Sequence, residues 1–314
     1  MTSRKEHAIH HWTREETERL VPQLRAWWDA SARDFPWRHA NCSPWGILVS
    51  EVMSQQTPME RVLPYWRAWM RAWPTPADLA SASQADVLQA WGHLGYPRRA
   101  VNLRRAAQKI VTDYAGHVPD TLEDLLALPG IGQYTASAVL SFAFHKRIAV
   151  VDTNIRRVID RVFDGHESLG GATKPADWKR AEELLPRDAE DSVLWNKALM
   201  EIGATICTAS ETRGEAGPLT QISEWRKAGR PRPQSASGHV RTRKKQVWNG
   251  TDRQCRGTIL KALRSQNDPA HAHLSAGQVS ALWKDASQLL RCVGALEKDG
   301  LISVDANGTV RFAR

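Results

Sequence analysis

Two acidic residues of the sequence stand in surroundings that suit acid–base or electrostatic catalysis. Glu51 lies inside the mainly apolar run 45–53. A glutamate in such a run is either paired or has its pKa raised by burial, and a raised pKa suits a general acid. Asp152 follows the apolar residues 149–151 and precedes an amphipathic helical pattern over 153–162. It is therefore either the N-cap of a helix or a carboxylate that stabilises positive charge on a sugar.

A tight turn with the sequence LPGIG, from Leu128 to Gly132, leads into small and apolar residues that follow Gln133 and Tyr134. Glycines before a helix leave the backbone N–H groups unobstructed, and together with the helix N-terminus they make an anion site. With Gly130 and Gly132 in these places, the stretch predicts a helix-hairpin-helix that grips a DNA phosphate without reading the bases. Taken alone, the same pattern also fits a plain helical turn.

The elements that must position these residues are mainly helical. Between residues 14 and 225 the apolar residues recur at helical spacing, Pro and Gly separate the segments, and sustained strand alternation is absent. The stretch 229–251 predicts a basic flexible linker, which is either a solvated tether or a phosphate-contacting segment. Residues 252–314 predict three helices and a hairpin at Asn307–Gly308, a winged-helix-like unit. The predicted domains are therefore 1–228, 229–251 and 252–314.

Charge and cysteine content indicate which class of partner this 314-residue chain binds and in which cellular compartment it is expected to work. The formal net charge of +9 favours an anionic partner such as nucleic acid, although many soluble proteins are mildly basic. No apolar run approaches the roughly 20 residues of a membrane span, and the polar N-terminus lacks the apolar core of a signal peptide. The four cysteines are far apart and form no CxxC pair. The cysteine spacing predicts free thiols in a reducing cytoplasm, without disulfides. The protein is expected to associate with the nucleoid and not with a membrane.

Four motifs together resemble one enzyme family. The stretches SEVMSQQT (50–57), GHLGYPRRA (92–100), LPGIGQYTASA (128–138) and VDTNIRRV (151–158) occur in the order and spacing of the helix-hairpin-helix DNA glycosylases. Over residues 14–225 they are most similar to adenine DNA glycosylases of the MutY type, in an actinobacterial-like form. The resemblance implies a mainly α, two-lobed fold, here followed by the small winged-helix-like unit.

The resemblance also implies roles for single residues. Glu51 would protonate N7 of a flipped adenine, and Asp152 would stabilise the oxocarbenium-like sugar, with Tyr134 and Asn154 positioning these groups. Related endonuclease III lyases carry a lysine where this chain has Tyr134, so a monofunctional enzyme is expected. The partner would be double-stranded DNA carrying adenine opposite 8-oxoguanine or guanine, bound by a monomer.

A second set of residues would hold the DNA. Gln56 and Tyr96 match positions that wedge into the base stack, although Tyr96 also fits a simple turn aromatic before a proline. The expected DNA-binding residues are Gln55, Gln56, Tyr96, Leu128, Gly130, Gly132 and Gln133.

The chain departs from the family pattern in two places. The family usually binds a four-iron four-sulfur cluster through cysteines spaced C-x6-C-x2-C-x5-C. The corresponding positions here are Cys207, Gly214, Gly217 and Ser223, so a clusterless member without cofactor or metal is expected, its loop held by packing around Trp225. The part after the linker is also too short for the larger C-terminal domain with which many members recognise 8-oxoguanine.

Two other functions remain open at this point. A thymine or uracil mismatch glycosylase uses a similar tyrosine and aspartate, but a pyrimidine has no N7 for Glu51 to protonate. A catalytically silent DNA-binding regulator would use the winged-helix-like unit, but it would not need Glu51, Tyr134 and Asp152 together.

Overall fold

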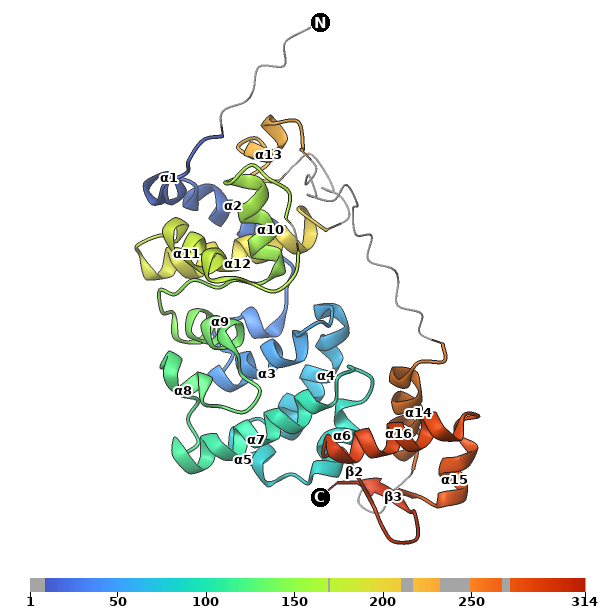
Figure 1. Cartoon of the computed structure of the whole chain (residues 1–314). Coiled ribbons are helices and arrows are strands. Elements are labelled where there is room, and N and C mark those ends of the chain that lie inside the picture. Colours follow the sequence, from blue (N-terminus) through green and yellow to red (C-terminus); the bar gives the residue numbers. More distant parts are fainter. Residues whose placement is uncertain (1–8, 169, 210–216, 232–248, 267–271, 314) are drawn as a thin grey trace, which may run out of the picture. The chain divides into compact units, whose positions relative to one another are not determined.

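The computed structural model describes residues 9–168, 170–209, 217–231, 249–266 and 272–313. The chain forms two compact units. Unit 1 is drawn from Met1–Ile47, Asp120–Leu122 and Gly132–Arg241, and unit 2 from Leu48–Pro119, Glu123–Ile131 and Thr242–Arg314. Figure 1 labels the α-helices of both units and the strands β2 and β3.

Unit 1 is built around one long buried helix, α12. Its elements are α1 (Arg14–Glu18), α2 (Val21–Ser31), the 3-10 helix Pro36–Arg38, α9 (Gln133–Phe144), α10 (Thr153–Val162), α11 (Pro175–Leu184), α12 (Ala189–Thr205) and α13 (Glu224–Lys227). α12 packs against α2 and α10. Its buried Glu201 accepts hydrogen bonds from Arg33 and Arg38. Burial alone would raise the pKa of Glu201, but these bonds lower it to about 2, so the pair of arginines holds an ionised carboxylate.

Unit 2 packs its helices around a tryptophan core. Its elements before the linker are α4 (Met59–Ala72), α5 (Pro76–Ser81), α6 (Gln84–Trp91), α7 (Arg98–Asp113) and most of α8 (Leu122–Leu126); α3 (Pro44–Ser54) begins in unit 1 and continues into unit 2. Trp69 and Trp91 meet edge to face with ring centroids 5.5 Å apart. α7 lies against α5 and α6 with its apolar face buried.

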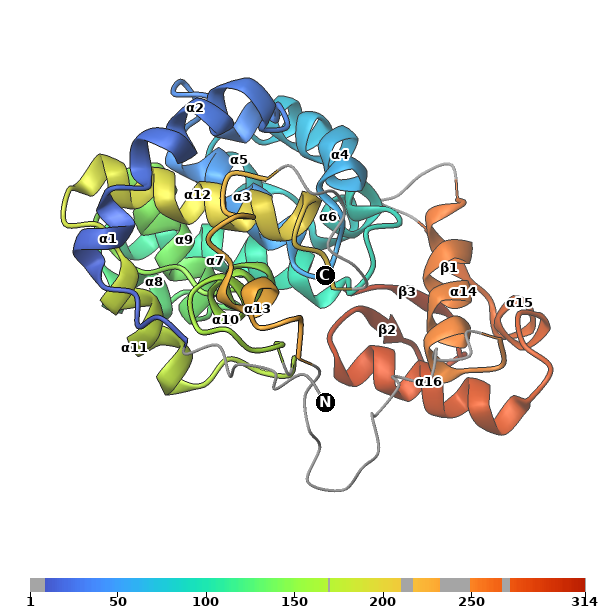
Figure 2. The same ribbon diagram turned by 90° about the horizontal axis from the view of Figure 1, so that it is seen from above.

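The C-terminal part of unit 2 combines helices with a small sheet. It contains α14 (Asp252–Arg264), β1 (His273–Leu274), α15 (Ala276–Ala281), α16 (Ala286–Lys298), β2 (Ile302–Val304) and β3 (Val310–Phe312). The antiparallel strands follow the order β1-β3-β2, with Ser303 opposite Arg311 (Figure 2). Asp305 accepts hydrogen bonds from the N–H groups of Asn307 and Thr309, which closes the turn between β2 and β3.

The predicted helical character is confirmed, and so is the small C-terminal sheet. Strand β1 adds a third strand that the hairpin pattern did not indicate. The predicted linker falls largely on residues 232–248, which lie outside the described residues, and the domain boundaries stay a prediction. Within the described residues, no helix combines the length and apolar character needed to cross a membrane.

Candidate active site

Asp152 caps the N-terminus of α10. Its Oδ1 accepts hydrogen bonds from the backbone N–H groups of Asn154 and Ile155, at 2.9 and 2.7 Å. Burial raises the pKa of Asp152, and the hydrogen bonds from Ile155 and Asn154 and the charge of Arg157 oppose that rise. The carboxylate therefore stands at the positive end of a helix dipole, with both oxygens fixed in direction.

The side chain of Asn154 is held by groups of its own helix, α10, and of that helix's cap. Its Nδ2 donates to Asp152 Oδ2 at 2.8 Å, and its Oδ1 accepts from Arg157 Nη2 at 2.7 Å. A Cβ at Gly203 of α12 would come within 2.7 Å of the Asn154 carbonyl oxygen, so only glycine permits this approach of the helices. The sequence reasoning missed Arg157, which also donates to the carbonyls of Gly203 and Cys207.

Tyr134 and the residues before it form the start of α9. Gly132 is the N-cap, and a side chain added there would meet nothing within 4 Å. The Tyr134 hydroxyl lies 4.0 Å from Met200 Sδ on α12. Gln133 is exposed. Among the described residues, the space beside Gly132 is therefore open, which would let an anionic partner approach the α9 N-terminus.

The preceding residues of the turn belong to unit 2. Gly130 has φ +79, and a Cβ there would lie 2.7 Å from Asn102 Cβ on α7, so its backbone and its packing both require glycine. Leu128 is buried, and its N–H donates to the Leu125 carbonyl. Its side chain therefore belongs to the core, and the DNA contact expected of Leu128 stays a prediction.

Glu51 lies on α3 and is buried, with 6% of its surface exposed. Leu48 and Val52, on the same helix, are buried as well. Beyond the end of α3, Gln56 adopts φ +55, and Tyr96, after α6, adopts φ +47. Left-handed backbone is costly for residues other than glycine and gathers at functional sites. Both residues expected to wedge into the base stack thus have unusual backbone.

Arg99, near the start of α7, ties these two segments together. Its guanidinium donates to the carbonyls of Val52, Met53 and Gln55 at the end of α3, to the Thr57 hydroxyl, and to the carbonyls of Leu94 and Gly95. Burial lowers the pKa of Arg99 to about 10, so it remains charged at neutral pH. The sequence reasoning missed this residue. A cation in the first turn of a helix is unfavourable because of the helix dipole. This placement was the feature of the sequence that could have identified Arg99.

Replacing Arg99 by lysine is expected to slow the base release that the resemblance implies about tenfold, a loss of about 1.4 kcal/mol in the transition state. A lysine keeps the charge but has three donors and no planar fork, so several carbonyls lose their partner. Single-turnover rates on a mismatched duplex measure the effect. Arg67→Lys on the exposed face of α4 is the matched control. Equal rates for the two variants would show that Arg99 does not position these segments.

The structure divides the expected site residues between the two units. Unit 1 holds Asp152, Asn154, Tyr134, Gly132 and Gln133. Unit 2 holds Glu51, Gln55, Gln56, Tyr96, Leu128 and Gly130. Hydrogen bonds join Asp152 to Asn154 in unit 1, while Arg99 joins the segment of Gln55 to the loop before Tyr96 in unit 2.

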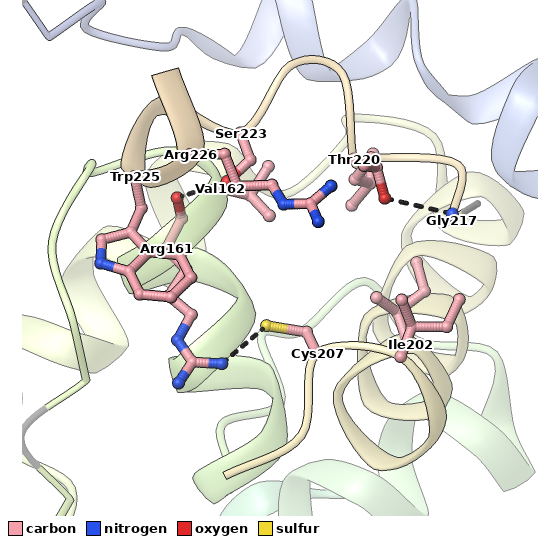
Figure 3. A pocket seen from close by; sticks show the side chains of 11 residues that line it. Arg161, Val162, Ile202, Cys207, Gly217, Thr220, Ser223, Trp225 and Arg226 are labelled. Carbon is pink, nitrogen blue, oxygen red and sulfur yellow. Dashed lines mark hydrogen bonds between the residues drawn. The ribbon is translucent and has the colours of Figure 1, made fainter. Parts of the chain in front are cut away.

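Three of the four positions that the resemblance assigns to cluster ligands, Cys207, Gly217 and Ser223, line a small cavity of about 30 Å³ in unit 1 (Figure 3). Arg161 Nη1 lies 3.5 Å from Cys207 Sγ, and its guanidinium carbon lies 4.7 Å from the Trp225 ring centroid. The Ser223 hydroxyl donates to the Arg161 carbonyl at 3.0 Å. Trp225, expected to help hold this loop, thus contacts the arginine.

This donor set does not fit a four-iron four-sulfur cluster. Such a cluster needs four thiolates, whereas Cys207 supplies one and Gly217 and Ser223 supply none. Gly214 lies outside the described residues. The guanidinium of Arg161 also points toward the sulfur, where a cluster iron would need to bind. That the protein holds no cofactor stays a prediction.

Comparison with known proteins places the chain in a family. The model of the HhH-GPD superfamily base excision DNA repair protein matches residues 49–183. The chain is 44% identical to the adenine DNA glycosylase of Mycobacterium tuberculosis over 291 residues, 92% of this chain and 91% of that protein. It is also 44% identical to the adenine DNA glycosylase of Mycolicibacterium smegmatis, over 93% of this chain and 94% of that protein.

A solved structure supports the fold. The structure of a thermostable thymine-DNA glycosylase matches with a TM-score of 0.61 and 29% identity, covering 68% of this chain and 98% of that chain. The likeness to the two mycobacterial proteins extends over the C-terminal part as well, since it spans nine-tenths of each chain. The chain therefore belongs to the HhH-GPD superfamily of base excision DNA repair proteins and, within it, to the adenine DNA glycosylases.

Proposed function

We propose that this protein is a monofunctional glycosylase that hydrolyses the bond between adenine and deoxyribose where adenine is mispaired with 8-oxoguanine or guanine in double-stranded DNA. The observation that carries the proposal is the presence of two carboxylates, the buried Glu51 on α3 and the half-buried Asp152 at the cap of α10, in a chain similar to adenine DNA glycosylases along nine-tenths of its length.

The proposed reaction begins with extrusion of adenine from the base stack. Glu51 donates its proton to N7, and the C1′–N9 bond breaks with its electron pair leaving on the base. Asp152 stabilises the positive charge that develops on the sugar, as in glycoside hydrolysis by two carboxylates. Water then adds to C1′ and loses a proton, which leaves an abasic site and free adenine.

The other site residues support these steps. The fixed hydrogen bond from Asn154 Nδ2 to Asp152 Oδ2 orients the carboxylate. Tyr134 stands where a lyase would need an amine nucleophile, which supports hydrolysis without strand cleavage. The exposed Gly132 cap is proposed to bind a phosphate, and Gln56 and Tyr96 to hold the opened stack.

Single-turnover cleavage of three duplexes tests the proposal. They carry adenine opposite 8-oxoguanine, adenine opposite guanine, and thymine opposite guanine, and alkali converts abasic sites to strand breaks. We expect adenine release from the first two and no strand break before alkali. Thymine release alone would overturn the substrate. DNA binding without release of any base would support the silent regulator instead.

A further inference from the structure

The described residues of the C-terminal part, 249–266 and 272–313, pack directly against α6. The buried side chain of Gln84 donates to the Gly300 carbonyl at 2.7 Å. Gln89 donates to the Arg264 carbonyl at 2.8 Å, and Arg264 Nε donates in return to the Leu88 carbonyl at 3.1 Å. These long-range bonds place the C-terminal part in one compact body with α6 and α7.

The same packing places charged side chains of the C-terminal part next to the segment that carries Tyr96. Asp299 lies between two arginines, Arg98 of α7 at 3.4 Å and Arg256 of α14, with which it forms a second ion pair. Arg253, also on α14, places its guanidinium carbon 4.9 Å from the centroid of the Tyr96 ring. The C-terminal part thus contacts this segment at two neighbouring points.

Two guanidinium groups lie near the ring of Tyr96. Its backbone is left-handed, and 45% of its surface is exposed. Arg99 lies 5.5 Å from the ring centroid, and Arg253 lies nearer. A guanidinium over a tyrosine ring is attracted by the ring's negative face. Arg253 is itself exposed, so its charge remains accessible to a phosphate.

We propose that the C-terminal part completes the DNA-binding surface through Arg253, which orients the Tyr96 ring and supplies a positive charge to the phosphate beside the opened base stack. Arg253 is a positioning residue. The inference rests on the proposed role of Tyr96 at DNA, and it gives residues 249–314 a function in substrate binding that does not require them to read the opposite base.

Binding of the full chain to a resistant substrate tests this inference. The probe is a fluorescent duplex with 2′-fluorinated deoxyadenosine, which resists hydrolysis, opposite 8-oxoguanine. Arg253→Ala is expected to weaken binding about fivefold and to reduce the slope of log affinity against log salt by about one. Arg253→Lys is expected to restore the slope, since it keeps the charge. Arg311→Ala, which removes an equal charge from β3, should change affinity less than twofold.

A double-mutant cycle separates positioning from simple charge. In a Tyr96→Ala background, Arg253→Ala is expected to cost less than twofold, because the ring that it orients is gone. A 2-aminopurine beside the lesion should also lose its unstacking signal in Arg253→Ala. Equal effects of Arg253→Ala with and without Tyr96, or an affinity equal to that of Arg311→Ala, would overturn the inference. Failure of the proposed function is distinct, since it shows as absent adenine release by the unsubstituted protein.

Discussion

Glu51→Gln should reduce single-turnover release of adenine by about a thousandfold, within the range that general acids contribute. Glutamine has nearly the same shape as glutamate but no proton to give to N7. Because Glu51 is buried on α3 among apolar residues, the amide should leave the fold and the melting temperature nearly unchanged. Quenched-reaction gels with an adenine–8-oxoguanine duplex measure the rate, and anisotropy checks that the variant still binds.

The matched control is Glu183→Gln on α11, where the glutamate is half-exposed and pairs with Arg180 at 3.4 Å. Its rate should equal that of the unsubstituted protein. A Glu51→Gln variant that binds DNA and releases adenine within tenfold of the original rate would remove Glu51 from the mechanism. Another group would then have to supply the proton.

Asp152→Asn is expected to lower the rate by a similar factor, about a thousandfold, while the protein stays folded. Asparagine is as good an N-cap as aspartate, so the hydrogen bonds from the backbone N–H groups at the start of α10 remain. The charge disappears, and so does the acceptor for the Asn154 side chain. Asp152→Ala removes the cap as well and should cost about 1 kcal/mol of stability. Comparing rate and thermal unfolding for both variants separates a catalytic carboxylate from a structural cap.

Asp188→Asn is the control for an aspartate whose only role is to cap a helix. Asp188 caps α12, accepting from the N–H of Asp191 at 2.9 Å, and its replacement should leave the rate unchanged. If Asp152→Asn behaved in the same way, Asp152 would be only a cap.

The raised pKa of Asp152 determines in which direction the reaction rate and the stability of the fold change with pH. The proposed mechanism needs the ionised form of Asp152, so the rate should fall as pH decreases through a value above the 3.8 of an ordinary aspartate. Because the folded state holds this proton more tightly than the unfolded chain, ionisation of Asp152 weakens the fold at neutral pH. Asp152→Asn removes this charge but also loses the one hydrogen bond from the Asn154 side chain. The variant should therefore lose no more stability than that hydrogen bond contributes.

Features that depend on neighbours along the chain could be predicted from the residues alone. The helical spacing, the cap at Asp152 and the hairpin at Asn307–Gly308 follow from local backbone chemistry, and the structure has them. Glu51 inside an apolar helix follows from the side-chain pattern in the same way. Four such local motifs in order were enough to indicate the family, because each motif is short and its chemistry is local.

The contacts that hold these local elements together became visible only in the folded chain. Arg99, Arg157 and Arg253 look like ordinary surface cations in a basic sequence, and their partners are carbonyls or rings on other elements. The left-handed backbone of Gln56 and Tyr96 likewise depends on packing, since residues other than glycine do not favour it alone. A guanidinium can bond several distant carbonyls at once, and which ones it meets is set by helix packing that no local pattern encodes.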